Sequence, residues 1–115
     1  HTNVQLCTKI KNRNMIIYNT TFHVEATDAK NFVIYLHEVY IPSAEKSGIL
    51  SNPRLTRILS HKEDDSECFS LQFEIEDTAK LHKWYSESGS KLNDDMLKTF
   101  KDKVTGFPTL MEVII

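Results

Sequence analysis

The clearest structural signal in this 115-residue chain is the segment Cys68-Phe69-Ser70-Leu71-Gln72-Phe73-Glu74-Ile75-Glu76. Apolar and polar side chains alternate along it without interruption, which is typical of a strand with one face on a core and the other face open. A similar alternation runs from Ile16 to Glu25, a segment rich in β-branched and aromatic residues. The sequence therefore predicts two half-buried strands, whose polar faces carry Asn19, Thr21 and His23 and Ser70, Gln72 and Glu74 respectively.

Between these strands the apolar positions recur first at helix spacing and then at strand spacing. The helical set begins at Ala29 and continues to Tyr40, so we expect an amphipathic helix that opens near residue 28. Pro42 disfavours helical geometry at the residue before it, and we expect the helix to break or kink there. After Pro53 the extended run Arg54 to Leu59 predicts a strand, and the charged residues 61–67 are typical of a hairpin loop.

A second helix is expected after the strand at Cys68 to Glu76, capped by Asp77 or Thr78. Its apolar positions continue to Val104, with an interruption at residues 86–90 that divides it into two pieces. The last strand is Phe107 to Ile115. The order of elements is therefore β-α-β-β-α-β. Because crossovers of this kind are right-handed, the pattern predicts an α+β, ferredoxin-like fold, a four-stranded antiparallel sheet with both helices on one face.

Composition and charge exclude several classes of protein. The chain has 14 Lys and Arg residues against 16 Asp and Glu residues, so no excess of positive charge indicates a nucleic-acid partner. No apolar run approaches the roughly 18 residues of a membrane span. Two cysteines, Cys7 and Cys68, are too few for a secreted disulfide framework. We therefore expect a cytoplasmic protein that binds neither nucleic acid nor membrane.

The first 14 residues differ in charge from the rest of the chain. They contain Lys9, Lys11 and Arg13 and no acidic residue, which gives +3 and leaves 11 bases against 16 acids, or −5, for residues 15–115. We expect a single ferredoxin-like domain over residues 15–115 and a leader of upstream or artificial origin over residues 1–14. The alternative is that Val4 to Ile10, which alternates, adds an edge strand.

The predicted sheet face away from the helices is polar but carries few charges. Two such faces packed together would enclose a barrel with room for a small ligand, so we expect a homodimer. The predicted ligand contacts are Asn19, Thr21, His23, Arg57, Gln72 and Glu74. Within this set His23 is the candidate general base. Arg57 is a candidate for a bidentate pair with a carboxylate ligand or with Glu74, and a structural ion pair at the dimer interface is the alternative.

Several segments together resemble a known family. They are Met15 to Val24, Tyr40-Ile41-Pro42, Pro53 to Leu59, Leu71-Gln72-Phe73, Trp84-Tyr85 and Gly106 to Leu110. Over about residues 15–115 the chain is similar to an uncharacterised bacterial family, domain of unknown function 4286. The resemblance implies a dimeric α/β barrel of ferredoxin-like type. It implies no activity, cofactor or catalytic residue.

For the other residues that could form a functional site, the sequence favours a role in the core or on the surface. Tyr18 and Trp84-Tyr85 fit a flavin or aromatic pocket, but aromatic residues at these spacings are usually core. The charged segment around His61 and Glu63 lacks the ligand spacing of a zinc or calcium site, so we expect a solvated turn and no metal. Cys68 has no CxxC companion, and we expect no reactive thiol. No glycine-rich phosphate loop is present, and we expect no cofactor.

Three functions of different classes remain open. The favoured one is a homodimeric ligand-binding or interaction module with a polar barrel interior. The second is a cofactor-free monooxygenase or isomerase that uses His23 as a base beside a buried apolar pocket. The third is a protein-interaction domain with a filled barrel, whose acidic surface binds a basic partner. A cavity beside His23 would favour the first two functions.

Overall fold

A computed structural model describes residues 15–115. The strands of this part of the chain form one four-stranded sheet. The strands are β1 (Ile16–Glu25), β2 (Ser51–Arg57), β3 (Ser66–Ile75) and β4 (Val104–Glu112). Their order across the sheet is β2-β3-β1-β4, and every neighbouring pair is antiparallel. This is the ferredoxin-like arrangement that the element order predicts, so the predicted fold class is confirmed. The predicted edge strand Val4 to Ile10 lies outside the described residues.

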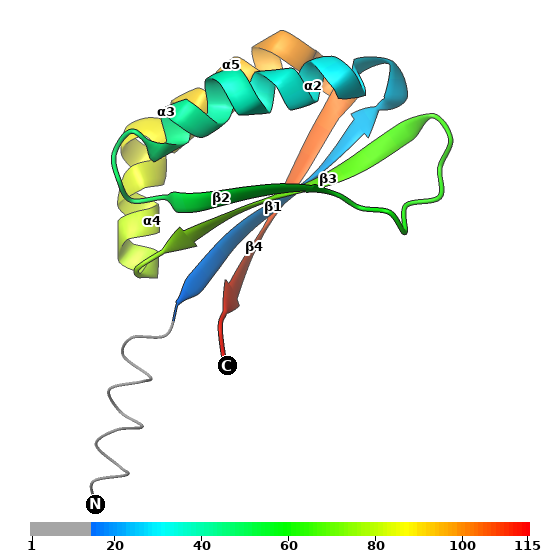
Figure 1. The fold of residues 1–115 in the computed structure, drawn as a ribbon. Coiled ribbons are helices and arrows are strands. Elements are labelled where there is room, and N and C mark those ends of the chain that lie inside the picture. Colours follow the sequence, from blue (N-terminus) through cyan, green and yellow to red (C-terminus); the bar gives the residue numbers. More distant parts are fainter. Residues whose placement is uncertain (1–14) are drawn as a thin grey trace, which may run out of the picture.

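Both helical segments cover the same face of the sheet (Figure 1). The first contains η1 (Ala26–Asp28), α2 (Ala29–Tyr35), η2 (Leu36–Tyr40) and α3 (Ile41–Glu45). The second contains α4 (Thr78–Trp84), η3 (Tyr85–Gly89), α5 (Ser90–Phe100) and η4 (Lys101–Lys103). The other face of the sheet has no covering element among residues 15–115. We call it the open face.

The core lies between the helices and the inward faces of the central strands. Its largest fully buried side chains are aromatic and include Trp84, Phe22, Phe32 and Phe73. The rings of Phe22 and Phe32 meet edge to face with centroids 5.0 Å apart, a favourable geometry for aromatic pairs. The alternation of β3 is seen directly, because Phe69, Leu71, Phe73 and Ile75 are all buried.

The α-helical pattern of the first segment is interrupted just before Pro42, where a break or kink is predicted, but the segment does not end there. It continues to Glu45 because a π-helical turn precedes the proline, in which the Ile41 N–H donates to the Leu36 carbonyl five residues earlier. A similar turn joins α4 to α5, where the Ser90 N–H donates to the Tyr85 carbonyl. A π turn shifts the hydrogen-bond register by one residue, so the helix accommodates the local irregularity without ending.

The boundaries of β2 and β4 differ from the predicted ones by two to three residues. β2 begins at Ser51, before Pro53, because an edge strand tolerates a proline that lacks the N–H donor. β4 begins at Val104 rather than Phe107 and ends at Glu112. No helix within residues 15–115 is long and apolar enough to cross a membrane.

Candidate functional site

The register of the strands places most of the predicted ligand contacts side by side on the open face. On β1 and β3, Asn19 lies opposite Gln72 and Thr21 lies opposite Ser70. The Asn19 amide is almost completely buried, accepts a short hydrogen bond from the Ser70 hydroxyl and donates to Thr21 Oγ1 at 3.1 Å. These contacts fix the side chains in the centre of the face.

Gln72 and Glu74 continue the same face toward β2. Glu74 Oε1 accepts a hydrogen bond of 2.7 Å from Asn52 Nδ2. A depression of about 490 Å³ lies here, with Ile17, Arg54, Gln72 and Glu74 in its wall. The prediction of a ligand on this face stays a prediction, and this depression marks where such a ligand would lie.

Arg57 is not brought together with the other five predicted contacts. It lies opposite Phe69, and therefore on the helix side of the sheet, with its guanidinium carbon 5.4 Å from the centre of the Phe69 ring. Its Nε donates to Glu67 Oε1 at 2.9 Å, so its carboxylate partner is Glu67 rather than Glu74. Arg57 shares this side with Leu55, two residues earlier, as the period of two in a strand places them.

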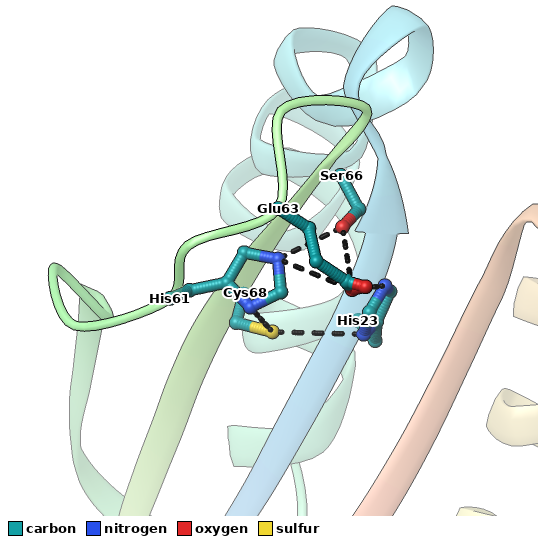
Figure 2. A network of polar contacts seen from close by, with 5 residues as sticks. All are labelled: His23, His61, Glu63, Ser66 and Cys68. Atoms are coloured by element: carbon teal, nitrogen blue, oxygen red, sulfur yellow. Dashed lines mark hydrogen bonds and ion pairs between the residues drawn. The ribbon is translucent and has the colours of Figure 1, made fainter.

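His23, the sixth predicted contact, lies in a cluster at one end of the open face. It is opposite Cys68, because β1 and β3 pair in register. The segment between β2 and β3 folds back so that His61 and Glu63 reach the same two side chains (Figure 2). Backbone hydrogen bonds hold this segment at both ends, from the Ile58 N–H to the Cys68 carbonyl and from the Ala26 N–H to the Asp65 carbonyl, each 2.9 Å long.

The donor atoms of this cluster face one another. Cys68 Sγ lies 3.4 Å from His61 Nδ1 and 3.8 Å from His23 Nδ1. The two other ring nitrogens point toward Glu63, whose Oε1 lies 3.7 Å from His23 Nε2 and 3.9 Å from His61 Nε2. Ser66 Oγ also lies 2.8 Å from His61 Nε2. Burial raises the pKa of the Cys68 thiol, and the nearby Glu63 carboxylate raises it further.

Sequence reasoning missed this cluster. It predicts a solvated turn at His61 and Glu63 and an isolated thiol at Cys68, whereas the structure places His23, His61 and Cys68 where their donor atoms all lie within 4.8 Å of one another. The available signal was the shared polar face of His23 and Cys68. It was not sufficient, because the register that pairs them and the path of the loop are set by contacts distant in sequence.

A separate cavity of about 470 Å³ lies on the helix side, between α5 and the strands β1 and β4. Its wall includes Tyr18, Trp84 and Tyr85, the three aromatic residues that the sequence places in the core by preference. Tyr40, Asn93 and Met96 also line it. The rings of Tyr18 and Trp84 meet edge to face with centroids 6.4 Å apart. Two aromatic residues from β1 and α4 thus form one side of a space that a small molecule can occupy.

Two features define the wall around Trp84. Its side chain is 1% exposed, and its Nε1 has no hydrogen-bond partner among residues 15–115. A Cβ at Gly89 would lie 2.5 Å from Cζ3 of the indole ring, so only glycine lets the η3 turn approach Trp84 this closely. Burial is also the main cause of the raised pKa of the Tyr40 hydroxyl, which the Tyr18 hydroxyl raises further.

The family model for a domain of unknown function, DUF4286, matches residues 15–114. The chain belongs to this family. No curated protein matches the sequence. The predicted resemblance is thereby confirmed, and the matched residues coincide with the part of the chain that the structure describes.

Solved structures share the fold at low sequence identity. A dimeric ferredoxin-like protein from an uncultured marine organism is 14% identical, with a TM-score of 0.66 over 90% of this chain and 98% of that chain. An ethyl tert-butyl ether D (EthD) family protein from Bacillus halodurans is 16% identical, with a TM-score of 0.64 over 86% and 99%. A protein from Bacillus cereus described as a putative antibiotic biosynthesis monooxygenase is 16% identical, with a TM-score of 0.58 over 89% and 95%. At these identities the likeness shows the fold alone.

Proposed function

We propose that this protein is a homodimer in which each protomer binds one neutral, planar small molecule in the cavity beside Trp84. The observation that carries the proposal is the cavity itself, with its volume of about 470 Å³ and its wall of aromatic and aliphatic side chains. Small-molecule sites are typically apolar clefts of about 300–1,000 Å³ with a few polar groups that orient the ligand.

The side chains of the wall select the class of ligand. Among the described residues, those that line the cavity include no Asp, Glu, Lys, Arg or His, so the site offers no counter-ion to a charged molecule. The rings of Trp84 and Tyr85 favour contact with a flat ligand. The amide of Asn93 and the hydroxyl of Thr20 supply hydrogen-bonding groups at the same wall.

We place the interface of the homodimer on the open face of the sheet. There β4 presents Phe107, which is 63% exposed, and Met111, which is 39% exposed. Both lie beside the polar side chains of β1, since Thr21 pairs with Phe107 and Ile17 with Met111. A second copy packed on this face would remove the two apolar side chains from water, which favours association. Solved relatives of the same fold are described as dimeric ferredoxin-like proteins, which supports this assignment.

The geometry favours binding over catalysis. The cofactor-free monooxygenase or isomerase considered from the sequence requires His23 as a base beside an apolar pocket. Phe22 lines the cavity, and successive strand residues point to opposite faces, so His23 points away from it. A general base must lie within hydrogen-bond reach of the proton that it removes.

A thermal-unfolding screen against neutral aromatic compounds such as indole, naphthol and quinoline tests the proposal. A ligand at a hundred times its Kd adds about 2.7 kcal/mol to the free energy of unfolding. We expect at least one compound to raise the melting temperature in a saturable way, with one molecule bound per chain.

Two variants of the same helix localise the effect. Asn93→Phe places a ring in the cavity, and Asp94→Phe places the same ring on the exposed neighbouring position, which does not line the cavity. We expect the first variant to lose the shift and the second to keep it. Equal shifts in both variants, or no shift with any compound in the wild type, would contradict the proposal.

A further inference from the structure

The cluster of His23, His61 and Cys68 is not explained by the proposed ligand cavity. It lies on the opposite face of the sheet, and it gathers two imidazoles and a thiol from two strands and a loop. We propose that these three side chains are the ligands of a Zn²⁺ site, with Glu63 and Ser66 as the groups that orient the two imidazoles.

The first argument is the spacing of the donor atoms. With Zn–S of about 2.3 Å and Zn–N of about 2.0–2.1 Å, tetrahedral angles place a sulfur and a nitrogen ligand about 3.6 Å apart. The distances from Cys68 Sγ to the two Nδ1 atoms are 3.4 and 3.8 Å, on either side of that value. All three donor atoms lie within 4.8 Å of one another, so one ion reaches all of them after small side-chain rotations.

The second argument is the direction of the remaining ring nitrogens. A histidine that binds a metal through one nitrogen commonly donates its other N–H to a carboxylate or another acceptor, which fixes the orientation of the ring. Here both Nδ1 atoms face the thiol, and both Nε2 atoms face Glu63. His61 Nε2 has the Ser66 hydroxyl at 2.8 Å, and this hydroxyl donates to Glu63 Oε1 at 3.4 Å. The cluster thus contains ligands and a layer of orienting groups.

The third argument is the chemistry of the ligand set. One thiolate with two imidazoles suits borderline and soft ions such as Zn²⁺, whereas Mg²⁺ and Ca²⁺ prefer oxygen ligands. Three protein ligands also leave one tetrahedral position for water or another molecule, as in zinc sites that are not purely structural. Each of the three ligand side chains is only partly buried, so the chain's own side chains leave room for that fourth ligand.

The test uses the full chain, stripped of metal with a chelator and titrated with Zn²⁺ by calorimetry. The same protein is titrated with Co²⁺, whose spectrum identifies a thiolate ligand through its near-ultraviolet charge-transfer band and a tetrahedral site through its intense visible bands. We expect one ion per chain and both spectral features.

The variants separate this site from other metal-binding groups. Cys68→Ser and His61→Ala are expected to abolish the saturable binding of Zn²⁺, and Cys68→Ser to abolish the charge-transfer band. Cys7→Ser and His82→Ala are the matched controls, because they remove a thiol and an imidazole elsewhere in the chain. Glu63→Gln removes the charge of the orienting carboxylate and is expected to weaken Zn²⁺ binding about 10- to 100-fold with an unchanged cobalt spectrum.

The isosteric Cys68→Ser change keeps the test valid if a histidine variant fails to fold, which circular dichroism shows. Binding of Zn²⁺ by Cys68→Ser as tight as by the wild type would overturn the proposal. So would a cobalt spectrum with no thiolate band, or loss of binding in Cys7→Ser alone. None of these results bears on the aromatic cavity, so the two proposals fail independently.

Discussion

Gly89 has less room for a side chain than Gly106, the other glycine in the wall of the aromatic cavity. A methyl group at Gly89 would lie 2.5 Å from the ring of buried Trp84, far inside contact distance. In an ordinary exposed helix Gly→Ala stabilises by about 1 kcal/mol, so the sign of the effect is diagnostic.

We expect Gly89→Ala to lower the free energy of unfolding by about 1–3 kcal/mol, because the indole must move or the turn must open. Urea denaturation measures this change. Glu87→Ala, an exposed substitution in the same turn, is the control. A Gly89→Ala variant as stable as the wild type would mean that Trp84 is not held against this turn.

Because the hydroxyl of Tyr40 is buried, we expect the free energy of unfolding to decrease at alkaline pH. The pKa of this hydroxyl in the folded protein lies above the value of about 10 in the unfolded chain. Above that pH the unfolded state releases a proton that the folded state retains. The contribution of Tyr40 to stability is therefore complete below about pH 10 and decreases above it by about 1.4 kcal/mol per pH unit.

Chemical denaturation between pH 9 and 11 measures the effect. Tyr40→Phe should lose less stability over this interval than the wild type, although Tyr18, whose pKa burial also raises, contributes in both proteins. Parallel pH profiles for the two proteins would contradict the assignment of a buried, protonated Tyr40.

The sequence predicts which face of the sheet a side chain lies on better than it predicts which side chains it contacts. The period of two in a strand places Asn19, Thr21 and His23 together on one face, and the structure agrees. The contact between His23 and Cys68 depends on the register of β1 and β3. The contact of His61 with Cys68 depends on the path of an irregular loop. Arg57 lies on the helix side with Leu55, two residues earlier, as the period of two in a strand places them, and not on the open face.

Among the elements, α4 has the clearest start signal. Asp77 is extended in backbone conformation and its Oδ1 accepts a hydrogen bond of 2.8 Å from the Lys80 N–H. This is the capping interaction that the sequence predicts for Asp77 or Thr78, and it satisfies one of the free N–H groups of the first turn.

We expect Asp77→Ala to reduce the free energy of unfolding by about 1 kcal/mol. Asp94→Ala, at an exposed position inside α5, removes the same charge without a capping interaction and should not destabilise the protein. Thermal and urea unfolding compare the two variants. Equal stability of both would indicate that the first turn of α4 does not depend on this cap.

The sequence predicts which segments are helices and which are strands, but it does not predict where all of them end. Strong alternation identifies β1 and β3 from the sequence, because β3 buries every second residue from Phe69 to Ile75 against the helices and β1 buries Phe22 and Val24. The continuation of the first helix through Pro42 is not predictable from propensity. It depends on a π turn that re-partners the Ile41 N–H, and packing of Leu36, Tyr40 and Ala44 into the core holds the segment in place.

We expect the protein to form a dimer through the open face of the sheet. Met111→Glu puts a charge on that face without touching the wall of the aromatic cavity. We expect it to shift the protein from dimer to monomer in size-exclusion chromatography with light scattering. Ile34→Glu, an equally exposed apolar position in α2 on the helix side, should remain dimeric.

A monomeric wild type at micromolar concentration would contradict the proposed dimer, and so would a Met111→Glu variant that stays dimeric. The sequence indicates this association only through a face with few charges. The exposed side chains of Phe107 and Met111 become visible as a surface only when β4 is placed beside β1.

Fluorescence of Trp84 can show whether the cavity beside it holds a small neutral ligand. Trp84 is the single tryptophan of the chain, so its emission reports on the cavity wall alone. The probe is N-phenyl-1-naphthylamine, a neutral aromatic compound that accepts energy from tryptophan. We expect saturable quenching of Trp84 with energy transfer at one probe per chain, lost in Asn93→Phe and kept in Asp94→Phe. Absence of saturable transfer in the wild type, or equal transfer in Asn93→Phe, would contradict the proposed ligand site.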